Sequence, residues 1–112
     1  MKGGRGYQIL TACTMKIKIH ELASEEFDEA IEWYELQSKG LGKRFKQSVI
    51  EQIKKIKKNP TWYLIEAENI HKAYVPKFPY KILYTIENKN TVVIWAIAHM
   101  HRRPRYWKPR IN

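Results

Sequence analysis

Residues 80–99 read YKILYTIE NKN TVVIWAIAH, and this stretch decides the fold. Two runs rich in β-branched and aromatic residues flank an Asn-Lys-Asn turn, a combination typical of a β-hairpin. A third run of the same kind at 70–75 comes just before them, across a bend that Pro76 and Pro79 bracket. Short connections of this kind join antiparallel strands, so the three runs predict a twisted antiparallel sheet.

Two helical patterns precede these strands. The first should have Ser24 as its N-cap, acidic residues in its first turn and an end near Lys39, because a glycine follows. The second carries an apolar stripe at helical spacing and should end at Asn59-Pro60, since the residue before a proline leaves the helical region. A link as short as residues 40–42 predicts that the two helices pack as an antiparallel hairpin.

The segment before the helices alternates apolar and polar residues at 15–20 and predicts a short strand. The expected order is therefore β-α-α-β-β-β, an α+β fold in which a helical hairpin covers one face of an antiparallel sheet. Residues 1–14 hold three closely spaced glycines and are expected to form a flexible extension, with residues 15–112 as a single domain. No pattern assigns residues 62–69.

The composition is strongly basic. The 112 residues carry 21 lysines and arginines against 11 acids, for a formal net charge of +10, which favours a polyanionic or acidic partner. Seven of the acids precede Lys39, so the excess positive charge lies downstream, in the second helix and after the last strand. The single cysteine excludes an internal disulfide and favours a reducing compartment, and no apolar run is long enough for a membrane helix.

The residues after the last strand combine cations with aromatic rings. Arginines bind phosphates and aromatic faces stack on bases, so this segment is a candidate for contact with a nucleic acid or another target. An equally simple interpretation is that Tyr106 and Trp107 pin the tail to the body. For most lysines of the second helix, a solvated face is the simpler interpretation. The candidate contact residues are Arg103, Arg105 and Trp107 of the tail and Lys43, Arg44 and Lys46 of the helix.

The chain holds no glycine-rich phosphate loop, no nucleophile elbow and no metal-ligand spacing, so we expect no metal and no cofactor. A cluster at the end of the last strand suits metal-free RNA cleavage. Imidazoles exchange protons near neutral pH, guanidinium groups stabilise charge on a phosphorane, and a tyrosine stacks on a base or donates a proton. These candidate catalytic residues are His99, His101, Arg102 and Tyr106. We interpret four acids, Glu25, Glu26, Glu29 and Glu32, as a solvated helix face.

A set of short motifs, taken in order, resembles a known family. The motifs are FDEAIEWYE at 27–35, GLGKRF at 40–45, NP at 59–60, FPYKILY at 78–84, AIAH at 96–99, RRP at 102–104 and YW at 106–107. In this order and spacing the chain resembles the RelE/ParE superfamily of toxins from bacterial type II toxin–antitoxin modules, over about residues 16–108. The resemblance implies the fold predicted above, a cytoplasmic growth inhibitor, and a cognate protein antitoxin that holds it inactive.

The resemblance implies two kinds of target. RelE-like members are ribosome-dependent messenger RNA endonucleases that need no metal, and ParE-like members inhibit DNA gyrase by binding. The position that matches the RelE arginine falls near Met100, whereas segments 41–45 and 78–80 resemble the ParE side. The first hypothesis is therefore a ParE-like toxin that binds DNA gyrase. The alternative is a RelE-like endonuclease with His99 or His101 as acid or base, and a third is a basic nucleic-acid-binding module without toxicity.

Overall fold

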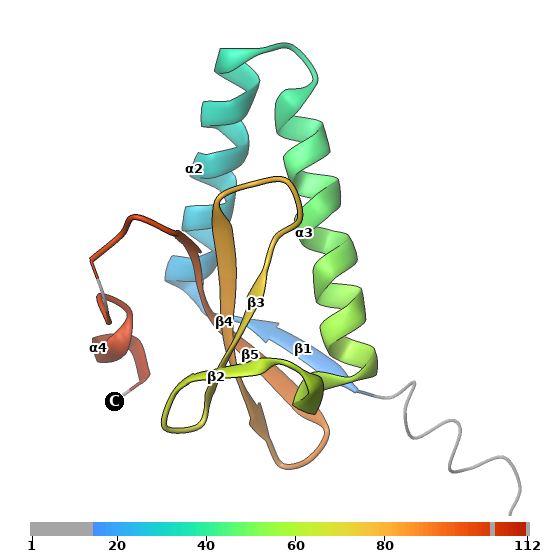
Figure 1. Ribbon diagram of the computed structural model, residues 1–112, viewed down its shortest axis with the longest axis vertical. Helices are drawn as coiled ribbons and strands as arrows, with labels where there is room; N and C mark the ends of the chain where they lie inside the picture. Colours follow the sequence, from blue (N-terminus) through green and yellow to red (C-terminus); the bar gives the residue numbers. More distant parts are fainter. Residues whose placement is uncertain (1–14, 104, 112) are drawn as a thin grey trace, which may run out of the picture.

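The computed structural model describes residues 15–103 and 105–111, which form a five-stranded sheet with a helical hairpin on one face (Figure 1). The strands lie in the order β1-β5-β4-β3-β2. The elements are β1 (Lys16–Ile19), α2 (Glu21–Gln37), α3 (Leu41–Lys58), the single-turn helix η1 (Pro60–Trp62), β2 (Leu64–Ala67), β3 (Ile70–Tyr74), β4 (Tyr80–Glu87), β5 (Thr91–His99) and α4 (Lys108–Ile111). The extension expected at 1–14 lies outside the described residues.

The predicted α+β class is confirmed, and β4 and β5 have the bounds that the sequence predicts. The antiparallel prediction is wrong for one strand, because β1 pairs with β5 in parallel, from Lys16 opposite Thr91 to Ile19 opposite Ile94. Short turns impose antiparallel pairing on β2 to β5. The helical hairpin separates β1 from the other strands, and a connection of that length allows a parallel pair.

Local features also differ from the prediction. Helix α2 begins at Glu21 and not after Ser24, because Nδ1 of His20 accepts the backbone N–H of Leu22 and caps the helix earlier. The unassigned segment forms η1 and the edge strand β2, which pairs with β3 across an irregularity after Ile65. The described chain ends in α4, a helix too short for periodicity to reveal.

Two apolar clusters hold the layers together. The larger lies between the sheet and the helical hairpin, where four rings pack closely: Tyr34, Phe45, Phe78 and Tyr80. Side chains alternate along a strand, so Leu83 points to the opposite face from Ile82 and belongs to the second cluster. That second cluster consists of Ile70, Leu83, Ala96 and Trp107. The sheet is thus covered by helices on one side and partly by the end of the chain on the other.

One carboxylate holds the turn of the helical hairpin. Glu35 accepts hydrogen bonds from the backbone N–H groups of Gly40 and Gly42, at 3.0 and 3.1 Å. Gly40 has a φ of +86°, and a Cβ built at Gly42 would lie 2.5 Å from the carbonyl oxygen of Ile31. The link therefore needs glycine at both positions, at Gly40 for its backbone angle and at Gly42 for the close approach of α2.

Gly42→Ala should lower the free energy of unfolding by about 2–3 kcal/mol, because the added methyl group meets backbone that moves only if the helices separate. Gly40→Ala is the matched control. Its methyl group meets nothing within 4 Å, so only the positive φ opposes it, at about 1 kcal/mol. Urea denaturation of both variants measures the difference, and equal losses would contradict the close approach at Gly42.

Candidate functional site

The C-terminal tail, residues 99–103 and 105–111, leaves the end of β5 and folds back beside the sheet (Figure 1). Trp107 anchors it, since its side chain is only 3% exposed in the cluster on the face away from the helices. A side chain so buried has no surface to offer a target. The prediction that Trp107 contacts a target is therefore corrected, and the alternative interpretation, that it pins the tail, fits its burial.

The tail covers an edge of β5 that β1 leaves open. The pairing with β1 reaches only to Ile94, so the backbone of β5 beyond this residue lacks a strand on that side. Arg110 donates to the carbonyl oxygen of Trp95 at 2.9 Å, and a carboxylate oxygen of Glu26 accepts the N–H of Ile97 at 3.0 Å. These two side chains take the place of a strand, because buried backbone groups need partners.

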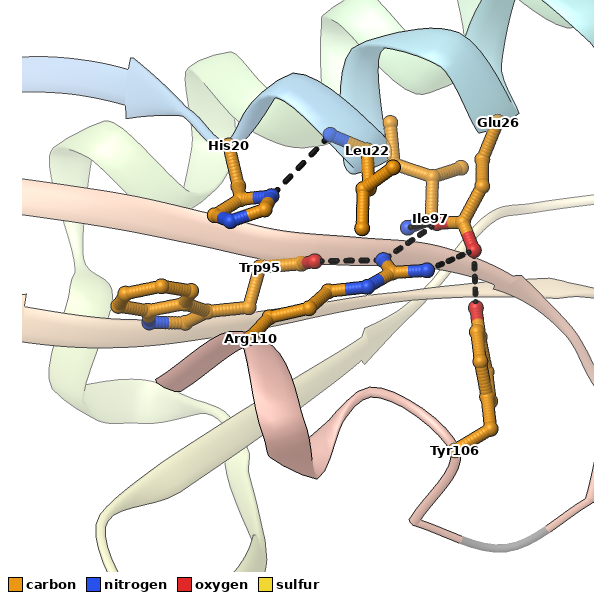
Figure 2. Close-up of polar contacts among 7 residues, drawn as sticks. All are labelled: His20, Leu22, Glu26, Trp95, Ile97, Tyr106 and Arg110. Carbon is orange, nitrogen blue, oxygen red and sulfur yellow. Dashed lines mark hydrogen bonds and ion pairs between the residues drawn. The ribbon is translucent and has the colours of Figure 1, made fainter. Parts of the chain in front are cut away.

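Glu26 gathers these contacts into one cluster, the Glu26 clasp (Glu26, Ile97, Tyr106 and Arg110; Figure 2). Oε2 of Glu26 accepts the hydroxyl of Tyr106 at 2.7 Å and Nη2 of Arg110 at 2.8 Å, while Oε1 accepts Nη1 of Arg110 at 3.1 Å. The side chains of Arg110 and Glu26 are 11% and 14% exposed. A two-pronged ion pair with so little access to water is a strong contact. The interpretation of Glu26 as part of a solvated face is therefore wrong.

The clasp also sets the chemical state of Tyr106. Burial raises the pKa of its hydroxyl, and the hydrogen bond to the Glu26 carboxylate raises it further. That carboxylate likewise raises the pKa of Arg110. The guanidinium carbon of Arg102 lies 3.9 Å from the centre of the Tyr106 ring, a cation–π contact. At neutral pH, Tyr106 is thus a neutral hydrogen-bond donor whose hydroxyl faces Glu26 and whose ring faces Arg102.

The histidines lie next to this cluster. A hollow of about 240 Å³ is lined by His99 and Arg102 and by the exposed indole of Trp33. Nδ1 of His99 accepts the backbone N–H of His101 at 3.1 Å, so a neutral His99 carries its proton on Nε2. The side chain of His101 is exposed and is not among the lining residues. The structure thus brings His99, Arg102 and Tyr106 together and places His101 outside the hollow.

The remaining candidate cations lie on two surfaces, one on the tail and one on α3. Arg103 and Arg105 are exposed on the tail. Lys43 and Arg44 line a groove of about 710 Å³ between α3 and residues 76–78, and Lys46 is exposed on α3 outside that groove. The predicted contact residues other than Trp107 are therefore accessible, on two separate surfaces.

Two lysines on the open face of the sheet share one carboxylate, which cancels one of their two charges. Glu66 binds Lys72 at 3.4 Å and Lys81 at 3.3 Å. Burial alone would raise the pKa of Glu66, but the two lysines outweigh it and hold that pKa below its ordinary value. This face consequently offers a phosphate less positive charge than its lysines suggest.

The roles of Glu26 and Arg110 were not predicted from the sequence. A signal for Glu26 was present, since it follows Ala23 by three positions and precedes Ala30 by four, and both alanines are buried. Such spacing places Glu26 beside the buried stripe of α2. Arg110 gave no comparable signal, because its partner is 84 positions away in the sequence.

Two features are absent from the part of the chain that the structure describes. Over residues 15–103 and 105–111, no three His, Cys, Asp or Glu side chains are grouped so that they could hold a metal ion. Within the same residues, no helix is both long enough and apolar enough to cross a membrane.

The sequence profile of one family, described as the ParE toxin of the type II toxin-antitoxin system parDE, matches residues 17–104. The chain belongs to the ParE toxin family. The resemblance to the RelE/ParE superfamily is thereby confirmed, and the chain is a toxin of a type II toxin–antitoxin system, a family that implies a cognate antitoxin. Among curated proteins, none matches the sequence.

Solved structures agree with the ParE family at the level of the fold. A chain of the chromosomal ParDE toxin–antitoxin system from P. aeruginosa matches with a TM-score of 0.67 and 15% identity, over 79% of this chain and 98% of that one. A mutant of the E. coli toxin RelE in the free state matches with a TM-score of 0.65 and 15% identity, over 88% of this chain and 99% of that one. Both matched chains thus share the architecture described above, and they do not distinguish between the two kinds of target.

Proposed function

We propose that this ParE-family toxin arrests growth by binding DNA gyrase in the cytoplasm, and not by cleaving messenger RNA. The observation that carries the proposal is the Glu26 clasp. In the clasp, the hydroxyl of Tyr106, the tyrosine that a nuclease of this fold would use, is bound to Glu26. Arg103 and Arg105 of the same tail stay exposed for contact with a partner.

A metal-free RNA-cleaving site needs a group free to move a proton and cations free to stabilise the phosphorane. The hydroxyl of Tyr106 donates to Glu26, and its raised pKa leaves it unsuited as a base near neutral pH. Arg102 stacks on the Tyr106 ring, and Glu66 cancels one of the two charges of Lys72 and Lys81 on the open sheet face. Two of the four candidate catalytic residues, Tyr106 and Arg102, are therefore engaged within the protein.

A binding inhibitor needs instead a firmly held surface with its charge directed outward. Trp107 and the Glu26 clasp fix the tail directly after Arg103 and Arg105, both of which are exposed. A net charge of +10 steers such a protein toward acidic surfaces. Arg103 and Arg105 are accordingly the proposed contacts with gyrase.

A RelE-like, ribosome-dependent endonuclease is the second candidate function, and one observation favours it. His99 and Arg102 line the hollow that Trp33 borders, and an exposed indole is a surface on which a base can stack. In this alternative, His99 moves the proton and Arg102 stabilises the phosphorane.

Plasmid topology and message integrity, measured in the same induced cells, test the proposal. After induction, plasmids should lose negative supercoils within minutes, and primer extension on abundant messages should show no new breaks. New breaks in translated messages with unchanged plasmid supercoiling would favour the endonuclease and contradict gyrase as the target.

His99→Ala combined with His101→Ala should leave growth arrest within about threefold of the wild type, because gyrase binding requires no proton transfer, whereas loss of a general acid or base typically costs a hundredfold or more. Colony counts over a range of inducer concentrations measure the effect. A loss of arrest in a double variant that still folds, judged by circular dichroism, would contradict the binding mechanism.

A further inference from the structure

A second hollow lies away from the tail, between α3 and the bend that joins β3 to β4. Leu41 and Phe78 give this groove an apolar part, and its volume is about 710 Å³. Figure 1 shows α3 and the tail on opposite sides of α2, and the groove is lined by α3 and residues 76–78. A partner bound in the groove would therefore leave the tail uncovered.

The groove walls are fixed by hydrogen bonds. Oγ of Ser48 donates to the carbonyl oxygen of Pro76 at 3.0 Å, and the buried amide of Gln52 donates to the carbonyl oxygen of Tyr74 at 2.7 Å. The first bond ties α3 to the β3–β4 bend, and the second ties it to the end of β3. The groove is thus formed before any partner arrives, which lowers the cost of binding.

The charge of the groove selects its occupant. Four cations line it, Lys43, Arg44, Lys55 and Lys77, against one carboxylate, Glu51. An apolar part ringed by positive charge suits a polypeptide with acidic side chains and an occasional apolar one, whereas a nucleic acid backbone would leave Leu41 and Phe78 without a partner.

We propose that this groove binds an acidic segment of the cognate antitoxin, at a place separate from the gyrase-binding tail. This inference rests on membership of the toxin family and not on gyrase as the target. Neutralisation and target binding then use different residues. It follows that substitutions can separate the two, and that a toxin altered in the groove stays active while its antitoxin no longer restrains it.

The test is Lys55→Glu combined with Lys77→Glu, two exposed groove lysines outside the proposed gyrase contacts. Affinity for the antitoxin encoded in the same operon, measured by calorimetry with the full-length chains, should fall about a hundredfold because like charges then face each other. Co-expressed antitoxin should no longer restore growth, whereas growth arrest without antitoxin should fall less than about tenfold, through weaker long-range steering only.

Lys54→Glu combined with Lys89→Glu is the matched control. Lys54 lies on the same helix outside the groove, and Lys89, like Lys77, is an exposed turn lysine with positive φ. The net charge changes equally in both double variants, so a general electrostatic effect would weaken both alike. Equal losses, or wild-type affinity of the groove variant, would overturn the proposal.

Other occupants give different results. Loss of growth arrest by the folded groove variant, with antitoxin affinity intact, would make the groove a target surface. Selective loss of DNA retention in a mobility-shift assay, again with antitoxin affinity intact, would make it a nucleic-acid surface. Either result would overturn the assignment to the antitoxin, and neither depends on whether gyrase is the target.

Discussion

Glu26→Gln should free the C-terminal tail and lower the free energy of unfolding by about 3 kcal/mol, because the substitution leaves Arg110 as a largely buried charge without its counter-ion. The substituted amide still accepts one hydrogen bond. Trp107 stays buried in the second cluster and keeps part of the tail in place. Hydrogen exchange should therefore rise at residues 99–111 well before it rises in β4 and β5. Gyrase inhibition should weaken when the tail is freed, since Arg103 and Arg105 lose their fixed position.

Glu29→Gln is the control, because Glu29 lies on the same helix, is exposed and has the same charge. It should change unfolding by less than about 0.5 kcal/mol. The double variant Glu26→Gln with Arg110→Gln should be more stable than the sum of the two single losses indicates, since neither charge is then stranded. Strict additivity, or unchanged exchange in the tail of the single variant, would contradict the clasp.

Arg103→Glu combined with Arg105→Glu should weaken gyrase inhibition about a hundredfold, because two attractive contacts become repulsive ones. Both side chains are exposed, so stability should hardly change. Antitoxin affinity should also be kept if the α3 groove binds the antitoxin. The measurement is a titration of purified gyrase with each toxin variant.

Lys16→Glu combined with Lys18→Glu provides the matched charge change for that titration. Both lysines are exposed on β1, at the sheet edge and away from the bend of the tail. Their reversal should cost less than about tenfold, through weaker long-range steering only. A similar loss in both double variants would mean that overall charge governs inhibition, and Arg103 and Arg105 would lose their role as contacts.

The fold was readable from the sequence where neighbouring residues decide the structure. The β4–β5 hairpin follows from its turn and strand composition, and the helical hairpin from its stripes, its glycine link and Asn59-Pro60. The parallel pairing of β1 was not predictable in this way, because it depends on which sheet edge a long crossover reaches. The start of α2 was misjudged because His20, an uncommon N-cap, replaces Ser24.

The candidate site, too, was predicted only where residues close together in the sequence decide it. Exposure of Arg103 and Arg105 follows from their charge, and the grouping of His99, Arg102 and Tyr106 follows from their nearness in the chain. The carboxylate that binds the tail comes from α2, far away in the sequence. Neither hydrophobic periodicity nor motif spacing pairs two charges across such a distance.

Supercoiling by purified DNA gyrase, titrated with the purified toxin, tests the gyrase assignment most directly. Inhibition should be complete near one toxin per gyrase subunit, should need no ribosome, and should be reversed when the cognate antitoxin is added. Gyrase that keeps full activity at a large excess of folded toxin, while the same preparation cleaves messages on ribosomes, would contradict the assignment.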